Sequence, residues 1–336
     1  MTGLSADPRR QPASDRAGPA EAAVHQIQAD SALETLAKNG KSFYWASRLL
    51  GRRMAVDAAE LYSFCRLLDD IADGDAPGGA NRLNAVRSQL VILKERGQPA
   101  VMDPALAPYL AVMRRCAIPV APLIHLLDGL LLDQDPMLVK DEDELVRYAY
   151  HVAGAVGLLM CPVLGCCDRA AFRFAVDMGI GMQLTNIARD ILEDAHLGRR
   201  YLPESWAGPL SPKQIIASAS APDTAAYKAV QASAGRLLGL ADRYYESGRD
   251  GLAFLPVRAR AGIAVAGEVY RRIGVRLRKR DLRWGDGRVV TSVPEKLDAS
   301  ISALASLKTG AARNKQAVHD NHLHQPIADL MDEALR

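Results

Sequence analysis

The sequence predicts an all-α fold built as one large domain, and three features of its composition lead to this prediction. Hydrophobic residues make up 49% of the 336 residues, which is enough for a sizeable core. Aromatic residues make up only 5%, so that core consists mainly of Leu, Ala, Val and Ile, and both Ala and Leu favour helix. The alternating β-branched pattern that is typical of strands is confined to residues 288–293.

Apolar residues of helical period follow one another along most of the chain. The expected helices cover residues 30–39, 43–50, 54–73, 82–96, 104–115, 120–132, 141–161, 168–194, 222–247, 257–280 and 293–308. Residues 1–25 are rich in Ala, Pro, Arg and Asp without any period, so we expect them to be disordered. The expected organisation is completed by an all-α domain over residues 26–308 and a polar tail over residues 309–336.

Local signals mark where several of these helices begin and end. Residues 75–79 contain a proline and two glycines and break the chain directly after residue 73. Residues 196–212 form a loop after the helix that ends near residue 194. The four acidic residues 141–144 precede an apolar helix, where negative charge interacts favourably with the helix dipole.

Two acidic runs, residues 69–73 and 190–194, lie inside these helices. Each places two aspartates four residues apart, so their carboxylates share one helix face with Cβ atoms about 5–6 Å apart. Such pairs repel each other, and their burial without compensation is costly. A divalent cation removes this repulsion, because hard cations bind carboxylate oxygens. Two such runs that face each other can hold Mg²⁺ together with a diphosphate.

Each acidic run continues a narrow polar stripe between apolar flanks. The first stripe consists of Tyr62, Arg66, Asp69 and Asp73. The second consists of Gln183, Asn186, Asp190 and Asp194, with Gly179 one turn earlier. Two acidic surface helices are the alternative, but surface helices usually carry a broad face rich in Lys and Glu. The matched stripes therefore predict a polar channel inside a helical bundle.

Six motifs follow one another in a specific order: residues 41–50, 61–73, 148–157, 183–194, 200–203 and, near the end, 269–273 with 286–289. Together they resemble the squalene/phytoene synthase family of head-to-head prenyltransferases, and most of all its bacterial phytoene synthases. The resemblance covers roughly residues 35–300. It implies a single-domain isoprenoid-synthase helical bundle with a central cavity.

The resemblance also implies roles for individual residues. The metal-side residues are Asp69, Asp73, Asn186, Asp190 and Asp194. The diphosphate-side residues are Ser42, Tyr62, Arg66, Gln183, Arg189, Tyr270 and Arg288. Tyr150 is expected to line the central cavity, and with Tyr62, Arg66 and the four aspartates it completes the expected catalytic set. Gly40 departs from the family pattern, which often has a serine there.

The implied reaction is the Mg²⁺-dependent condensation of two geranylgeranyl diphosphates through prephytoene diphosphate to phytoene, with Mn²⁺ as an alternative ion and without NADPH. One alternative is a farnesyl diphosphate enzyme that makes presqualene diphosphate, squalene or diapophytoene. Another is a non-catalytic assembly factor, although such a protein would be expected to lose its aspartates. The implied product is expected to pass to a phytoene desaturase.

The carbocation formed in such a reaction needs an apolar cavity that excludes water. The candidate lining residues are Gly154, Gly157 and Gly179 with Val156, Leu158 and Leu159. Glycines three residues apart on a helix leave a face on which a flat prenyl chain can lie. Close packing of two helices explains Gly154 and Gly157 equally well.

Charge and cysteine content exclude several classes of protein. A net charge of +3, from 42 basic and 39 acidic residues, does not indicate nucleic-acid binding. Residues 271–283 concentrate arginines, which indicates either a diphosphate or anionic-membrane contact or a solvated helix end. Five cysteines form no disulfide framework, and no apolar run is long enough to cross a bilayer. We expect a cytoplasmic protein that contacts the inner face of the membrane.

Three histidines, His319, His322 and His324, fall within six positions of the expected tail. They indicate either a metal site or a solvated tail, and the polar composition of the segment favours the solvated tail. The remaining histidines are isolated in the sequence.

Overall fold

A computed structural model of the chain describes residues 19–97, 103–134, 136–308 and 317–336. The predicted all-α fold is confirmed. Within these ranges the only β-type pairing is an isolated bridge between Leu138 and Arg200.

The helices of the first half of the chain are α1 (Pro19–Asn39), α2 (Lys41–Ser47), α3 (Arg52–Asp73), α4 (Gly79–Arg96), α5 (Ala107–Cys116) and α6 (Ala121–Leu132). Those of the second half are α7 (Glu142–Ala149), α8 (Ala155–Val163), α9 (Ala170–His196), α10 (Glu204–Ala207), α11 (Pro212–Ser218), α12 (Ala225–Asp250), α13 (Val257–Lys279), α14 (Val293–Ser306) and α15 (Ala328–Ala334). Short 3₁₀ helices cover Pro104–Leu106, Gly251–Phe254, Trp284–Asp286 and Asn321–Ile327, and a π-helical turn covers Tyr150–Gly154.

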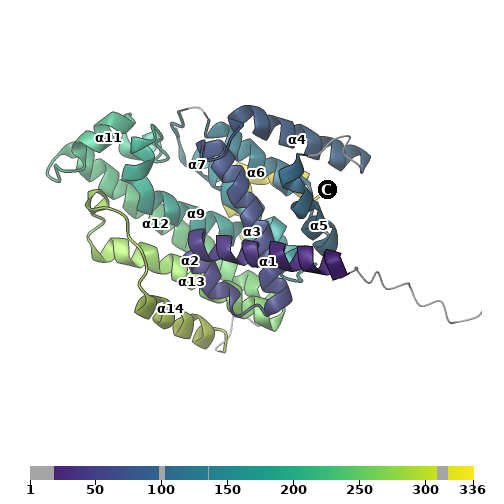
Figure 1. Cartoon of the computed structure of the whole chain (residues 1–336). Coiled ribbons are helices and arrows are strands. Elements are labelled where there is room, and N and C mark those ends of the chain that lie inside the picture. Colours follow the sequence, from purple (N-terminus) through teal and green to yellow (C-terminus); the bar gives the residue numbers. More distant parts are fainter. Residues whose placement is uncertain (1–18, 98–102, 135, 309–316) are drawn as a thin grey trace, which may run out of the picture.

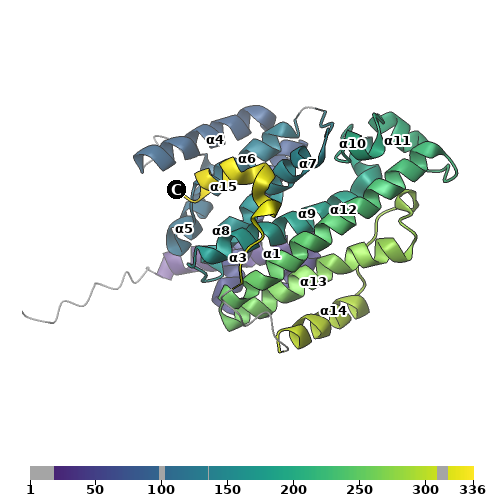
Figure 2. The ribbon, with the colours of Figure 1, turned by 180° about the vertical axis from the view of Figure 1, so that it is seen from behind.

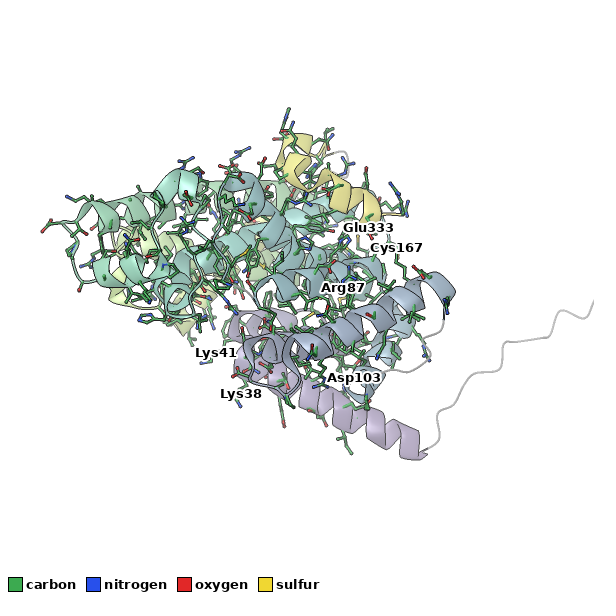
Figure 3. All side chains as sticks on the ribbon, turned by 90° about the horizontal axis from the view of Figure 1, so that it is seen from above. Lys38, Lys41, Arg87, Asp103, Cys167 and Glu333 are labelled. Atoms are coloured by element: carbon green, nitrogen blue, oxygen red, sulfur yellow. The ribbon has the colours of Figure 1, made fainter. Side chains whose placement is uncertain are left out.

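Helix α9 is the central element of the bundle. It packs against α12 and α13, which lie beside it in Figure 1, and against α8 and the π turn. The segment formed by residues 317–336 lies on the face opposite α1, as Figures 2 and 3 show. Because α9 contacts many of the other helices, residues on its successive turns reach different parts of the interior.

Two glycines bring the backbones of α8 and the π turn directly against α9. A Cβ atom on Gly157 would lie 2.3 Å from the carbonyl oxygen of Ala175, and one on Gly179 would lie 2.3 Å from that of Ala153. No side chain fits at these distances. The close-packing explanation of Gly157 is therefore correct, and Gly179 has the same role.

Several helix ends follow the signals in the sequence. Gly74 ends α3 in the left-handed conformation (φ = 83°), which glycine adopts without strain. The Asp141 side chain caps α7 by accepting a hydrogen bond of 2.9 Å from the amide of Glu144. These ends fix where the first acidic run stops and where the central helices begin.

Four details of the expected organisation were wrong. The helix expected over residues 141–161 is interrupted by the π turn, whose i→i+5 bonds leave no mark on the apolar period. Helices α10 and α11 lie in or beside the expected loop, and α1 begins at Pro19, inside the range expected to be disordered. Residues 1–18 and 309–316 lie outside the described residues.

The fourth detail is the expected tail, because its described part packs against the bundle. Leu323, Ile327 and Met331 are buried against the bundle. The prediction of solvated histidines was wrong for His324, which is buried, and for His319, whose side chain is 6% exposed. Only His322 is exposed.

The arginines of residues 271–283 pair with acidic residues of neighbouring helices. Arg271 and Arg278 both contact Asp242 on α12, at 2.9 and 2.8 Å. Arg272 and Arg276 contact Asp298 and Glu295 on α14, at 2.7 and 2.6 Å. Neither a solvated helix end nor an anion site describes these four side chains, because they join α12, α13 and α14 to one another. No helix in the described ranges has both the length and the apolar character needed to span a bilayer.

Candidate active site

The structure brings the two acidic runs to one polar cavity of about 120 Å³. Asp69 and Asp73 reach it from the C-terminal end of α3, and Asp190 and Asp194 reach it from the C-terminal end of α9. Further lining residues are Ala72, Leu130, Asp133, Tyr148, Gln183, Asn186, Ile187, Arg199 and Tyr201. We call this space the acidic cavity.

Negative charge in the acidic cavity is poorly compensated. Burial, followed by the charge of Asp73, raises the pKa of Asp69 to about 6. Burial, followed by the charge of Asp190, raises the pKa of Asp194 to about 8. Both runs also lie at C-terminal helix ends, where the helix dipole is negative and disfavours carboxylates. This cavity therefore attracts cations.

The side chains around the acidic cavity fit a divalent metal ion. Carboxylate and amide oxygens are the ligands of hard divalent cations. The Oδ1 atom of Asn186 is buried and has no hydrogen-bond partner, while its Nδ2 atom donates to Gln183 at 3.3 Å. A bound cation would supply the missing partner for this oxygen and would offset the burial and the repulsion that raise the pKa of Asp69 and Asp194.

Four arginines surround the acidic run residues. Arg66 contacts Asp69 at 3.0 Å and Asp70 at 2.5 Å. The remaining contacts are Arg189 with Asp190 at 2.5 Å, Arg288 with Asp190 at 3.1 Å and Arg199 with Asp73 at 3.2 Å. A guanidinium group binds phosphate oxygens in the same forked geometry as carboxylates. The arginines can therefore exchange a carboxylate partner for the oxygen of an anionic ligand.

Asp133 is a site residue that the sequence did not reveal. It follows α6 and accepts hydrogen bonds from the hydroxyls of Tyr148 at 2.9 Å and Tyr201 at 2.7 Å. Burial raises the pKa of Asp133. A single aspartate after an apolar helix has no partner at helical spacing, so only the fold shows that it faces Asp73 and Asp194. Arg199 was also missed.

A second, apolar cavity of about 320 Å³ runs beneath the acidic cavity. Gln183 and Asn186 line both cavities, so the two spaces meet at this turn of α9. The apolar cavity follows α9 from Ala171 to Asn186, a distance of roughly 22 Å at 1.5 Å per residue. Half of a bilayer's hydrocarbon core is about 15 Å thick. The apolar cavity is thus long enough for an extended lipid chain.

Small residues create the space, and aromatic residues stand near its junction with the acidic cavity. Gly157, Gly179 and Ala175 are among the small lining residues, which leave room between helices that remain in contact. The ring of Phe43 lies between those of Tyr62 and Tyr270, with centroid distances of 6.2 and 5.1 Å. Burial, followed by the nearby Tyr270, raises the pKa of Tyr62 to about 12, so this phenol stays neutral.

Most residues expected from the sequence line one of these two cavities, but some do not. Ser42 lies in the first turn of α2, beside Phe43, and lines neither cavity. A Cβ atom on Gly40 would lie 3.0 Å from the ring of Tyr62, which explains why a glycine fits here. Of the expected apolar lining residues, Gly154, Leu158 and Leu159 also lie outside the apolar cavity.

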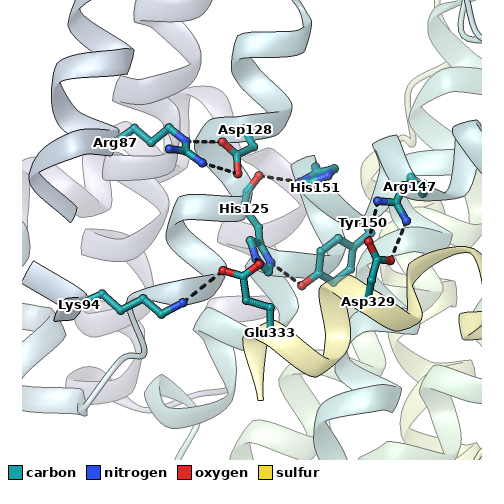
Figure 4. Close-up of polar contacts among 9 residues, drawn as sticks. All are labelled: Arg87, Lys94, His125, Asp128, Arg147, Tyr150, His151, Asp329 and Glu333. Atoms are coloured by element: carbon teal, nitrogen blue, oxygen red, sulfur yellow. Dashed lines mark hydrogen bonds and ion pairs between the residues drawn. The ribbon is translucent and has the colours of Figure 1, made fainter. Parts of the chain in front are cut away.

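Tyr150 lies outside both cavities, contrary to expectation. The π turn directs its side chain toward α6, where its hydroxyl lies 2.8 Å from Nδ1 of His125 (Figure 4). Glu333 on α15 lies 3.6 Å from the other ring nitrogen of His125. Tyr150 thus holds the ring of His125, whose other nitrogen faces the C-terminal segment.

Comparison with known proteins agrees with the geometry of the two cavities. The family model described as Squalene/phytoene synthase matches residues 36–295. A 15-cis-phytoene synthase from Pantoea ananas is 36% identical over 290 residues, which cover 84% of this chain and 93% of that protein. A 15-cis-phytoene synthase from Enterobacter agglomerans is 35% identical over 271 residues, which cover 78% and 90%.

A similar fold occurs among solved structures. The crystal structure of a dehydrosqualene synthase in complex with a ligand superposes with a TM-score of 0.73 at 27% identity, over 86% of this chain and 99% of that chain. The residues that the family model matches, 36–295, include both acidic runs. The chain belongs to the squalene/phytoene synthase family.

Proposed function

We propose that this chain is a prenyltransferase that joins two geranylgeranyl diphosphates head to head, through prephytoene diphosphate, to phytoene. One observation carries the proposal: a cavity lined by the aspartates of both acidic runs opens, at Gln183 and Asn186, into an apolar cavity of lipid-chain length. A molecule that fits both spaces has a strongly anionic head and a long hydrocarbon tail. A prenyl diphosphate has this chemistry.

The acidic cavity is the proposed binding site of the metal ion that the reaction needs. Enzymes of the family use a divalent metal ion, and we propose Mg²⁺, with Mn²⁺ as a substitute. The residues that would hold it are Asp69, Asp73, Asn186, Asp190 and Asp194. When bound, Mg²⁺ acts as a Lewis acid that stabilises the departing diphosphate.

The chain's own residues bind the substrate and protect the cation. Arg66, Arg189 and Arg288 lie beside the carboxylates and can bind diphosphate oxygens that the metal leaves free. The apolar cavity excludes water from the allylic cation, which water would otherwise capture. The rings of Tyr62 and Tyr270 line the apolar cavity near its junction with the acidic one, where an aromatic face stabilises positive charge.

The length of the prenyl chain is proposed from the relatives. Two relatives named 15-cis-phytoene synthase are 35–36% identical, which favours the C20 donor. Farnesyl diphosphate is the alternative donor, because the solved structure with a TM-score of 0.73 is a dehydrosqualene synthase. Transfer of the product to a desaturase stays a prediction of the resemblance.

Product analysis tests the proposal. Purified protein receives labelled farnesyl or geranylgeranyl diphosphate with Mg²⁺, with and without NADPH, and the hydrocarbon product is identified. We expect phytoene from the C20 donor without NADPH and no product from the Asp190→Asn variant. Squalene or dehydrosqualene as the main product would replace the C20 assignment, and no product from either donor would contradict the proposed reaction.

We also propose that α14 is the point of peripheral membrane contact. This helix turns its large aliphatic side chains outward and its small ones, Ala299 and Ala303, inward. The outward residues are Val290 just before the helix, then Val293, Leu297, Ile301 and Leu304, which are 67%, 59%, 50%, 69% and 37% exposed. We call this set the α14 stripe.

Basic residues near the α14 stripe favour an anionic bilayer as its partner. Asp298 and Glu295 are paired with arginines of α13. Burial, followed by the charge of nearby Lys41, lowers the pKa of Lys296. Membrane-bound substrates and products of this chemistry also require access to lipid.

Vesicle co-sedimentation tests the membrane contact. We expect the wild-type chain to bind vesicles containing phosphatidylserine and the Leu297→Ser/Ile301→Ser double variant to lose most of this binding. The Val318→Ser variant, which replaces another exposed aliphatic residue outside the stripe, is the control. Equal binding by the double variant would exclude α14 as the contact.

A further inference from the structure

A cluster of three potential metal ligands lies at the opposite end of α9 from the acidic runs. Asp177 on α9 faces His319 and His324 of the C-terminal segment. Their side chains are 0%, 6% and 7% exposed, and the ligand atoms all lie within 4.8 Å of one another. In the part of the chain that the structure describes, no other group of His, Cys, Asp and Glu residues converges so tightly.

The Asp177 carboxylate is the centre of this cluster. Its Oδ2 atom lies 2.8 Å from Nε2 of His319, and its Oδ1 atom lies 2.7 Å from Nε2 of His324. The hydroxyl of Ser247 on α12 donates to Oδ2 at 2.5 Å. Burial acts to raise the pKa of Asp177, but the contacts with His319 and His324 outweigh it and lower the pKa. The carboxylate is fully buried, and each of its oxygens faces an imidazole nitrogen.

The neighbours of His319 decide which of its ring nitrogens carries a hydrogen. Arg173 donates to Oδ1 of Asn321, and since a guanidinium group can only donate, this oxygen is an acceptor. Nδ1 of His319 lies 3.3 Å from the same oxygen and must donate to it. A neutral imidazole has one N–H, so Nε2 of His319 then presents a lone pair to the Asp177 carboxylate.

A lone pair and a carboxylate oxygen 2.8 Å apart repel each other unless a cation lies between them. A second proton on the imidazole meets this need, and so does a metal ion. His324 points its Nε2 atom at the same carboxylate, while its buried Nδ1 atom has no partner. Three ligand atoms therefore converge on one cation position between two chain segments.

We propose that Asp177, His319 and His324 bind a divalent transition metal ion of the Zn²⁺ class, at a site separate from the acidic cavity. Imidazole nitrogen is a good ligand for Zn²⁺, whereas Mg²⁺ prefers oxygen. Ligand distances of about 2.0–2.2 Å in tetrahedral geometry require the nitrogen and oxygen atoms to separate by roughly half an ångström. Ser247 or a water molecule completes the four ligands.

This site would fasten the C-terminal segment to the wall of the apolar cavity. Phe174 lines that cavity, and its ring centroid lies 5.3 Å from that of His319. The Tyr244 hydroxyl donates to the carbonyl of Leu323 at 2.8 Å, which holds the segment nearby. A bound ion would thus brace the part of α9 that borders the far end of the apolar cavity.

Other contacts hold the segment independently, so the site can be altered without releasing the whole segment. Arg147 contacts Asp329 at 2.7 Å, and Lys94 contacts Glu333 at 3.2 Å (Figure 4). Neither pair involves the three proposed ligands.

Zinc content tests the site directly. The full chain is stripped with a chelator, mixed with Zn²⁺ in an excess of Mg²⁺ that occupies the acidic cavity, desalted and analysed for metal. We expect one zinc ion per wild-type chain and at least about a tenfold lower affinity in His324→Gln and Asp177→Asn. The His322→Gln variant replaces the exposed neighbouring histidine and is expected to bind zinc like the wild type.

Two further measurements keep the test decisive if a variant fails to fold. Wild-type crystals soaked with Zn²⁺ are expected to show an anomalous peak between the rings of His319 and His324. Asn321→Ala, which frees Nδ1 of His319, is expected to weaken zinc binding about tenfold without removing a ligand.

Three outcomes would overturn the zinc site: a wild-type chain without zinc, unchanged zinc in His324→Gln, or a peak only at the acidic cavity. Protons alone would then join the imidazoles to Asp177. The zinc site does not depend on the proposed reaction, because Asp190→Asn is expected to keep its zinc while losing turnover.

Discussion

The acidic cavity and the apolar cavity share helices α3 and α9 and two residues, yet their chemistry is opposite. The C-terminal turns of α9 carry Asp190, which two arginines contact, and Asp194, whose pKa is raised to about 8 by burial and by the charge of Asp190. Its earlier turns carry the small residues Gly179 and Ala175 along the apolar cavity. Gln183 and Asn186 lie between the two halves and line both cavities. The same helices thus border the space proposed for the charged leaving group and the space proposed for the water-sensitive cation.

The two cavities are unfavourable for the folded protein for different reasons. The acidic cavity is unfavourable when empty, because like charges are buried at negative helix ends. The apolar cavity is unfavourable because helices that pack through glycines forgo side-chain contacts. A ligand with an anionic head, a metal ion and a hydrocarbon tail relieves both costs, and substitutions in each cavity should therefore have different consequences.

The largest expected effect concerns the acidic cavity. Asp69→Asn and Asp190→Asn remove a charge without changing shape, and we expect each to lower kcat by about 10²–10³-fold or more, because the leaving group loses its electrostatic stabilisation. Steady-state turnover measures this loss, and circular dichroism checks the fold. Asp223→Asn, which replaces an exposed aspartate that lines neither cavity, is the control. Wild-type turnover in either variant would contradict the metal-binding role proposed for Asp69 or Asp190.

A smaller and selective effect is expected in the apolar cavity. Ala171 lies at the far end from Asn186, and Ala171→Leu shortens the space for the tail. We expect kcat/KM for geranylgeranyl diphosphate to fall about 10–200-fold, with less change for farnesyl diphosphate, since extra methylene groups in a pocket have effects of this size. The exposed neighbour in Ala170→Leu is the control. An equal loss for both donors would show that chain length is measured elsewhere.

The pH dependence of stability separates the two cavities further. Asp69 and Asp194 have folded-state pKa values of about 6 and about 8, above the ordinary value of 3.8. The folded protein binds these two protons more tightly, so the stability that Asp69 and Asp194 contribute is fully present below about pH 4 and is lost as pH rises toward 8. We expect the melting temperature without divalent ions to fall by a few degrees over this range and Mg²⁺ to reduce the fall. If the melting temperature of the wild type rose with pH relative to that of the Asp194→Asn variant, the proposed charge repulsion would be contradicted.

The smallest catalytic effect is expected at Tyr150, which lies outside both cavities. Tyr150→Phe removes the hydrogen bond to His125, and we expect about 1 kcal/mol lower stability with turnover within about twofold of the wild type. Urea denaturation and steady-state kinetics measure the two quantities. A hundredfold loss of turnover at unchanged stability would show that Tyr150 acts on the substrate.

The sequence predicted what depends on helical period and missed what depends on long-range packing. The two acidic stripes are visible because Asp69 and Asp73, like Asp190 and Asp194, are neighbours on one helix face. Asp133 was missed because its partners lie far away in the chain. Tyr150 was misplaced because a π turn rotates the residues within it. The burial of His319 and His324 depends on Asp177, some 140 residues earlier.

Metal localisation in a substrate complex tests directly whether the acidic cavity holds the metal ion and the apolar cavity holds the prenyl chain. Crystals grown with Mn²⁺ and an unreactive thio-analogue of geranylgeranyl diphosphate can be measured at the manganese absorption edge. We expect manganese between the carboxylates of Asp69, Asp73, Asp190 and Asp194. The prenyl chain should extend along α9 toward Phe174. Manganese absent from this cavity, or a prenyl chain bound outside the apolar cavity, would contradict it.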